Sequence, residues 1–175
     1  MPSGVRVFQI NPSSPRLAAT LTLVGFVGLC LLVGASGAGL TEQAVRGWYL
    51  TLTPPPGTPP NWVFAPVWTA LYVMLGTAGW LVWRLPAYLS VQKRAALQLW
   101  GWQLLANALW TPAFFGLHST VLGLVVILPL VVLIGLTLAS FARLRPIAAA
   151  LLVPYLAWTC YAAYLNIGFW WLNRI

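Results

Sequence analysis

The side chains in this sequence that could recognise a ligand are amides and aromatic rings that recur inside long apolar runs. Gln103 and Asn107 are four residues apart, so they share a face of a helix. Trp100, Trp110 and Phe114 continue that face at helical spacing. Polar side chains are costly in lipid and usually point towards a bundle interior or a cavity. Such an inward face suits a flat apolar ligand, because the rings can stack on it while the amides orient it.

A second aromatic stripe lies near the end of the chain. Tyr155, Trp158, Ala162, Leu165 and Phe169 recur at spacings typical of one helix face. Trp158 falls close to the middle of its apolar run, although tryptophan prefers the membrane interfaces. The spacing leaves two explanations open: Trp158 packs in a core, or its ring and N–H line a pocket.

Hydrolysis, phosphoryl transfer and haem redox chemistry have no support in the sequence. The chain has one carboxylate side chain, Glu42, and one histidine, His118, so it lacks paired acids and a Ser-His-Asp set. Cys30 and Cys160 lie in apolar runs without the spacing of metal ligands. We therefore expect no metal site, no disulfide and no required cofactor. Glu42 precedes Arg46 by four residues, so the two could form an ion pair, or Arg46 could meet the carboxylates of a ligand.

The composition makes hydrocarbon the solvent for most of the chain. Of 175 residues, 61% are hydrophobic and 6% are charged, whereas a soluble domain has about 25% charged residues. Because a transmembrane helix needs about 20 apolar residues, the length fits four to six spans and no separate soluble domain. The net charge of +8 comes from cations scattered between apolar runs. We expect these to set the topology and attract anionic lipid, not to bind nucleic acid.

The apolar runs predict an all-α membrane protein, a five-transmembrane-helix bundle that forms one domain over residues 1–175. The helices are expected at about 17–38, 62–83, 95–115, 121–141 and 146–172. Residues 39–61 form the longest connection and contain the dense proline run Pro54–Pro60. Proline lacks an N–H donor and restricts the residue before it, so this run should be stiff and extended. One helical turn is expected before it, around Gln43–Leu50.

The placement of lysine and arginine predicts the orientation in the membrane. Two of these cations, Arg46 and Arg174, lie on one side. The other seven lie on the opposite side, in the polar arm Met1–Pro15 and in two basic turns: Arg6, Arg16, Arg84, Lys93, Arg94, Arg143 and Arg145. By the positive-inside rule, the N-terminus is cytoplasmic, and the C-terminus and the long proline-rich loop are on the outer side.

With that orientation, aromatic and amide groups of three helices lie at one depth. Trp68 and Tyr72 are in the outer part of their span, and Asn107 is near the middle of the next. The loop that carries Trp48 and Tyr49 lies on the same side. We therefore predict an aromatic cavity in the outer half of the bundle, roofed by the proline-rich loop.

Three blocks of the sequence resemble the TspO/MBR family of tryptophan-rich sensory and translocator proteins. The first runs from Trp48-Tyr49 through the prolines to PPNWVFAPVWTALY, which ends at Tyr72; the second is QLLANALWTPAFFG, Gln103–Gly116; the third is VPYLAW, Val153–Trp158, followed by Leu165-Asn166. The resemblance implies five helices, often as homodimers. It also implies binding of protoporphyrin and related tetrapyrroles, of cholesterol in animals, and of synthetic benzodiazepine-type ligands.

The resemblance implies a ligand cavity at Trp48, Trp68, Asn107 and Trp158, with a transport or sensory role. Together with the spacing, it predicts these ligand-binding residues: Trp48, Tyr49, Trp68, Tyr72, Gln103, Asn107, Trp110, Phe114, Tyr155, Trp158 and Ala162. The animal members carry a cholesterol motif of Leu, Tyr and a basic residue late in the last helix. Here Leu165-Asn166 is followed by Ile167, and the next basic residue is Arg174. A sterol is therefore left open as a partner, beside membrane lipids and porphyrin-like molecules.

Three classes of function remain open from the sequence. The leading one is a porphyrin-binding protein with a transport or sensory role. The second is an enzyme that breaks down porphyrin with light or oxygen, for which the resemblance makes Trp48 and Trp158 the candidate residues. The third is a membrane scaffold without a ligand. Small residues four apart could serve helix contacts within the chain or between copies in a homodimer: Gly135 with Ala139, and Thr159 with Ala163.

Overall fold

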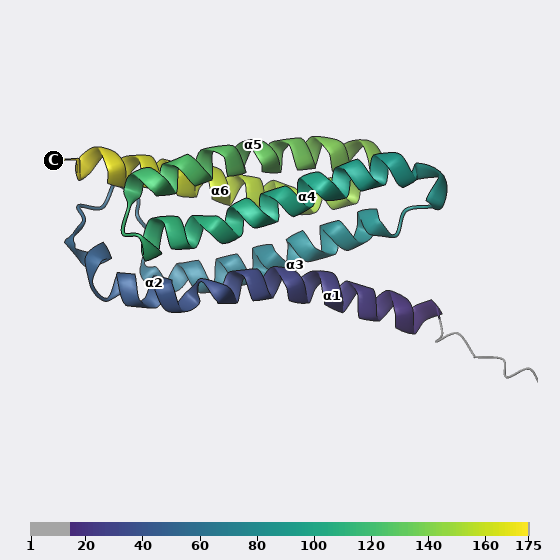
Figure 1. The fold of residues 1–175 in the computed structure, drawn as a ribbon, viewed down its shortest axis with the longest axis horizontal. Coiled ribbons are helices and arrows are strands. Elements are labelled where there is room, and N and C mark those ends of the chain that lie inside the picture. Colours follow the sequence, from purple (N-terminus) through teal and green to yellow (C-terminus); the bar gives the residue numbers. More distant parts are fainter. Residues whose placement is uncertain (1–14, 175) are drawn as a thin grey trace, which may run out of the picture.

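The computed structural model describes residues 15–174, so the predicted polar arm up to Ser14, with Arg6, lies outside the described residues, and Pro15 begins the first helix. Five long helices run side by side along one axis (Figure 1). They are α1 (Pro15–Ser36), α3 (Phe64–Trp83), α4 (Ser90–Thr111), α5 (Thr120–Leu144) and α6 (Pro146–Leu172). Within residues 15–174 no strand is present. The predicted all-α, five-helix fold is confirmed.

Four stretches of the described chain are long and apolar enough to cross a membrane: Arg16–Val45, Asn61–Trp83, Thr120–Leu144 and Pro146–Leu172. The fifth long helix, α4, is less apolar because it carries Lys93 and Arg94 in its first turns and Gln103 and Asn107 further along. Both amides are buried inside the bundle. These four polar residues of α4 therefore lie near one end of the bundle or in its interior, as expected for a helix in lipid.

The bundle is built around α6, which packs against α5 and α3. Helix α4 packs on α5, and α1 packs on α3. The α1–α3 contact is very close at Gly76, where a Cβ would lie 2.6 Å from the Cα of Val27. Thr159 and Ala163 are buried inside the single chain, so this predicted small-residue pair serves helix packing within the bundle. The space around Gly135 is open.

The helical segment that starts with α1 extends further along the chain than predicted, because a second helix follows it directly. Helix α1 ends at Ser36, near the predicted end at residue 38, but the chain resumes at once as α2 (Ala38–Val45) and then forms the short 3₁₀ helix η1 (Trp48–Thr51). The first part of the predicted loop 39–61 is therefore helical. Glycine at the junction permits a close helix contact and does not end the helical path: a Cβ on Gly37 would lie 2.5 Å from the Thr111 side chain.

The boundaries of α4 also differ from the prediction of 95–115. After a 3₁₀ turn, η3 (Ala87–Leu89), the helix begins at Ser90, because lysine and arginine are good helix formers and extend it through the predicted basic turn. Lys93 donates from Nζ to the Leu85 carbonyl at 3.0 Å. At its other end the helix becomes one π-helical turn, η4 (Pro112–Gly116). Pro112 has no N–H to continue the α-helical pattern, which accounts for the wider turn.

The proline-rich connection lies against α6 and ends in the short 3₁₀ helix η2 (Asn61–Val63). Tyr161 donates its hydroxyl to the Gly57 carbonyl at 2.5 Å, and Tyr164 donates to the Pro56 carbonyl at 2.9 Å. The Asn173 side chain makes two hydrogen bonds to the Thr53 backbone: it accepts from the N–H at 2.8 Å and donates to the carbonyl at 3.1 Å. The prolines offer carbonyl acceptors but no donors, so side chains of α6 and of Asn173, which follows it, supply the hydrogen bonds.

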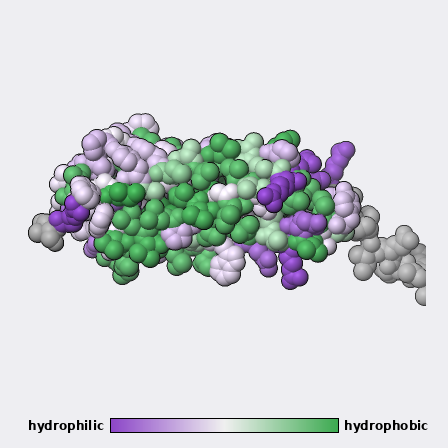
Figure 2. Space-filling view, turned by 90° about the horizontal axis from the view of Figure 1, so that it is seen from above, coloured by the Kyte–Doolittle hydropathy of each residue, from purple (hydrophilic) through white to green (hydrophobic). Residues whose placement is uncertain are grey.

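The described cations are distributed as the sequence predicts. Arg16 and the two basic turns lie at one end of the bundle, and Arg46 and Arg174 lie at the other, with an apolar band between them (Figures 1 and 2). Arg84 lies over the ring of Trp80 at 4.7 Å, and Arg174 lies over the ring of Trp171 at 3.2 Å. Such cation–π pairs suit helix ends, where an apolar ring and a charged group share the interface.

Candidate functional site

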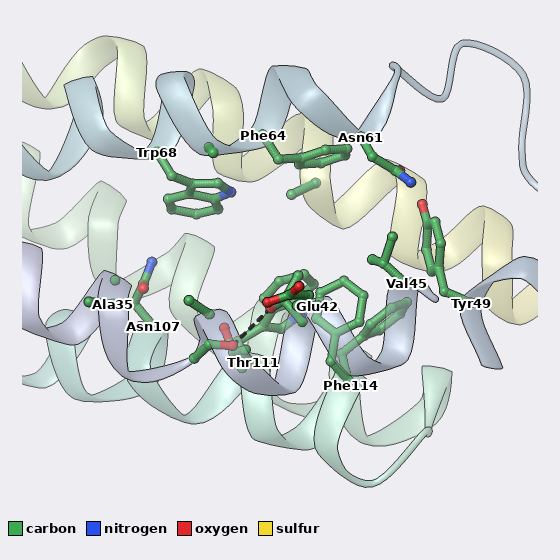
Figure 3. A pocket seen from close by; sticks show the side chains of 18 of the residues that line it. Ala35, Glu42, Val45, Tyr49, Asn61, Phe64, Trp68, Asn107, Thr111 and Phe114 are labelled. Carbon is green, nitrogen blue, oxygen red and sulfur yellow. Dashed lines mark hydrogen bonds between the residues drawn. The ribbon is translucent and has the colours of Figure 1, made fainter. Parts of the chain in front are cut away.

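A cavity of about 640 Å³ lies between α1, α2, α3, α4 and α6. Figure 3 shows α3 on one side and the α1–α2 junction with α4 on the other, with side chains from both sides directed into the space between. The volume falls within the range of about 300–1,000 Å³ that is usual for small-molecule sites. The lining is mainly apolar and aromatic, with a few polar side chains.

The deep end of the cavity is a chain of hydrogen bonds between buried side chains. Tyr72 donates its hydroxyl to Oδ1 of Asn107 at 2.6 Å, and Nδ2 of Asn107 donates to the Tyr155 hydroxyl at 2.9 Å. Tyr155 donates to Oε1 of Gln103 at 2.9 Å, and Gln103 donates onwards to the Trp100 carbonyl. Each group has a fixed donor or acceptor role, so the Asn107 amide has one orientation. One Nδ2 hydrogen and one oxygen lone pair remain for a ligand.

Two stacked aromatic pairs form facing walls. On α3, Trp68 stacks on Tyr72 with ring centroids 5.6 Å apart and 29° between the planes. On α4 and η4, Trp110 stacks on Phe114 at 5.3 Å and 20°. Trp110 donates from Nε1 to Oδ1 of Asn166 at 3.2 Å, which fixes its ring. The cavity therefore presents rigid aromatic surfaces on opposite sides of the space that a flat ligand would occupy.

The outer end of the cavity carries its polar rim. Glu42 of α2 lines the cavity and pairs with Arg46, with Nη2 of Arg46 2.5 Å from Oε1 of Glu42. The predicted ion pair is thus present, and both side chains are well exposed. Tyr49 and Asn61 also line this end (Figure 3). Burial raises the pKa of Tyr49 to about 12, so its hydroxyl is protonated and uncharged near neutral pH.

The structure brings most of the predicted ligand-binding residues together. Seven of them line the cavity: Tyr49, Trp68, Tyr72, Asn107, Trp110, Phe114 and Ala162. Gln103 and Tyr155 do not line it. Tyr155 accepts a hydrogen bond from Asn107 and donates one to Gln103, so the two residues orient the Asn107 amide. Trp48 and Trp158 also stand outside the lining.

Trp48 and Trp158 each lie one aromatic ring behind the cavity wall. Trp48 stacks on His118 with centroids 5.1 Å apart and meets the edge of the wall residue Phe114 at 5.6 Å. Trp158 meets the wall residue Phe64 edge-on at 6.0 Å. The Trp158 indole nitrogen is buried and has no hydrogen-bond partner in the described chain. Both rings support the wall and do not form its surface.

Sequence reasoning missed the whole wall that α1 and α2 provide. Its residues are small or aliphatic, apart from Glu42, and recur at helical spacing: Leu31, Gly34, Ala35, Gly37, Ala38, Thr41, Glu42 and Val45. Small side chains carry no chemical signal of their own. The signal that could have revealed this wall is that the helical spacing of these small and aliphatic residues continues past residue 38, where the helix was expected to end.

The predicted roof needs a correction. The run Pro54–Pro60, which the structure describes in full, does not line the cavity but lies on α6 through Tyr161 and Tyr164. Tyr49 and Asn61, at the two ends of the connection, reach the cavity, and α2 bounds its outer part. The prediction failed because it placed α2 in the loop and could not foresee the tyrosine hydroxyls that hold the prolines.

Comparison with known proteins identifies the family. The sequence profile of the TspO/MBR family matches residues 26–172. The chain is 40% identical to the tryptophan-rich protein TspO of Chlorobaculum tepidum, over 87% of this chain and 96% of that protein. It is 36% identical to the translocator protein of Bos taurus, over 87% and 90%, and 34% identical to the tryptophan-rich sensory protein of Cereibacter sphaeroides, over 85% and 89%. A multi-pass helical membrane protein with these blocks and this extent of identity belongs to the TspO/MBR family.

Proposed function

We propose that the protein binds protoporphyrin-type tetrapyrroles and similar flat hydrophobic molecules in the cavity between α1–α2, α3, α4 and α6, and that it serves a transport or sensory role in the membrane. The observation that carries the proposal is the pair of facing aromatic stacks, Trp68 with Tyr72 and Trp110 with Phe114, above an oriented Asn107 amide. The names of the relatives, a sensory protein and a translocator protein, are in keeping with such a role.

The physical argument follows from the shape and chemistry of the walls. A planar conjugated ring between two rigid aromatic surfaces gains stacking and buries apolar area with little loss of side-chain freedom. The amide at the deep end supplies one donor and one acceptor, which would orient the ring in its plane. We also propose the orientation that the cations favour, with the N-terminus cytoplasmic and the outer end of the cavity on the opposite side of the membrane.

The test is a titration of the purified protein with protoporphyrin, followed by quenching of tryptophan fluorescence. Ala65 lines the cavity on α3, whereas Ala70 is exposed on the same helix and does not line it. We expect Ala65→Phe to fill part of the cavity and weaken binding about tenfold or more, while Ala70→Phe leaves the affinity near that of the parent. Equal affinities of the two variants would count against the proposed site, and so would quenching that does not saturate.

A further inference from the structure

The charged groups in and near the cavity are poorly matched to a ligand that carries carboxylates. Of the residues that line the cavity, Glu42 is the one carboxylate, and none is a lysine, arginine or histidine. Arg46 pairs with Glu42 but does not line the cavity. Of the described cations, only Arg46 and Arg174 lie at this end of the bundle, and Arg174 lies over the Trp171 ring. The remaining described cations are at the opposite end.

A ligand carboxylate that entered this space would therefore meet like charge without a compensating cation in the wall. Glu42 is itself well exposed and paired with Arg46, so its repulsion of a ligand carboxylate is weak where water surrounds both groups and stronger for a carboxylate held between the apolar walls. The polar groups at the deep end, Tyr72 and Asn107, are uncharged and could offer a carboxylate a hydrogen bond from Asn107 but no compensating positive charge. An uncharged ring suffers no such repulsion, and a protonated amine is attracted by the Glu42 carboxylate, which strengthens binding.

We propose that Glu42 is a specificity-determining residue, which makes the cavity prefer uncharged or amine-bearing flat ligands over ligands whose carboxylates enter it. This inference rests on the proposed function and narrows it. For a ring with acidic side arms, the favoured arrangement is the one that keeps the acids on the side of Tyr49 and Asn61, beyond Glu42, and directs the edge without acids towards Asn107. The carboxylate of Glu42 then disfavours ligands whose own carboxylates must pass it to reach Asn107.

The experiment compares protoporphyrin with its dimethyl ester, which has the same ring without the two negative charges. The measured quantity is the ratio of the Kd of the diacid to the Kd of the ester. Detergent takes up the ester and the diacid to different extents, but this difference is the same for every variant and cancels between them. We expect Glu42→Gln to lower the ratio about three- to tenfold, with most of the change in the Kd of the diacid.

Arg46 provides the matched controls. Loss of Glu42 also frees Arg46, so attraction by Arg46 could imitate the loss of repulsion. We expect Arg46→Gln to raise the ratio, because it leaves Glu42 unpaired. In the Arg46→Gln background, adding Glu42→Gln should again lower the ratio. The pair is exposed and an exposed i,i+4 pair contributes little to stability, so all of these variants should fold, which a melting curve checks.

Two results would overturn the inference alone: an equal ratio in the parent protein and Glu42→Gln, or a double variant indistinguishable from Arg46→Gln. The second would mean that Glu42 acts only by holding Arg46. Absence of saturable binding for both the diacid and the ester in the parent protein would instead overturn the proposed function, and this inference with it.

Discussion

At the scale of single residues, the cavity depends on the orientation of one amide. Asn107 accepts from Tyr72 and donates to Tyr155, so the two phenols define which atom of the amide faces which side. Tyr155 is fully buried and donates its own hydroxyl to Oε1 of Gln103. In a low-dielectric interior such a network is stable only when every member has a partner. Asn107 is therefore a structural residue as well as a candidate ligand contact.

Replacing Asn107 should show this double role. Asn107→Leu keeps a similar volume but leaves the Tyr72 hydroxyl without its acceptor and Tyr155 without its donor. We expect the free energy of unfolding to fall by about 1–3 kcal/mol, the usual cost of unpaired buried polar groups. Adding Tyr72→Phe removes one of the stranded groups and should recover part of the loss. Thermal or denaturant unfolding in detergent measures both effects. A double variant less stable by the full sum of the single effects would show that the two groups do not interact.

At the scale of elements, the cavity has its fourth wall because the chain resumes as α2 directly after α1 ends at Ser36. Gly37 stands at the junction and contacts the Thr111 side chain so closely that a Cβ there would lie 2.5 Å from Cγ2 of Thr111. Thr111 begins the passage from α4 to the π-helical turn η4, which places both Phe114 and Phe115 on the cavity. The glycine and the wide turn thus shape neighbouring parts of the cavity wall that faces α3.

Two glycines near this junction offer a matched comparison. Gly37→Ala forces α2 away from α4, and we expect it to lower the free energy of unfolding by about 1–3 kcal/mol. Gly39 lies in α2 with open space around its would-be Cβ. Gly39→Ala should be neutral or raise stability by about 1 kcal/mol or less, because alanine favours the helix. Equal melting temperatures for the two variants would contradict the close contact at Gly37.

The elements differ in how far sequence could predict them. The uncharged runs that become α3, α5 and α6 were located to within a few residues, because lipid demands about 20 apolar residues in each. The start of α4 was placed late because Lys93 and Arg94 were assigned to a turn, although both residues favour a helix. The junction at Gly37 was unpredictable, since a glycine that ends a helix and one that admits a neighbour look alike in sequence. For the same reason, amides and rings identified three walls of the cavity, while the small residues of α1 and α2 did not reveal the fourth.

At the scale of the whole molecule, the two ends differ in charge and in covering. One end carries Arg16 and the basic turns, whereas the other carries the proline-rich connection, which two tyrosine hydroxyls of α6 and the Asn173 amide hold in place. The cavity opens towards the second end, where Tyr49 and Asn61 lie, with Glu42 between them and Asn107 (Figure 3). If the cations set the orientation, ligand recognition by the polar rim takes place at the outer face of the membrane.

Cysteine labelling in intact cells would test that orientation. In a background with Cys30 and Cys160 replaced by alanine, Leu50→Cys places a thiol at the end with the proline-rich connection, and Tyr88→Cys places one in the turn between α3 and α4. Both parent side chains are well exposed, at 68% and 81%. Because the positive-inside rule puts Arg84 and Lys93 on the cytoplasmic side, a membrane-impermeant maleimide should label Leu50→Cys in intact cells and Tyr88→Cys only after permeabilisation. The reverse pattern would place the rim of the cavity in the cytoplasm, and ligand would then have to enter from within the cell.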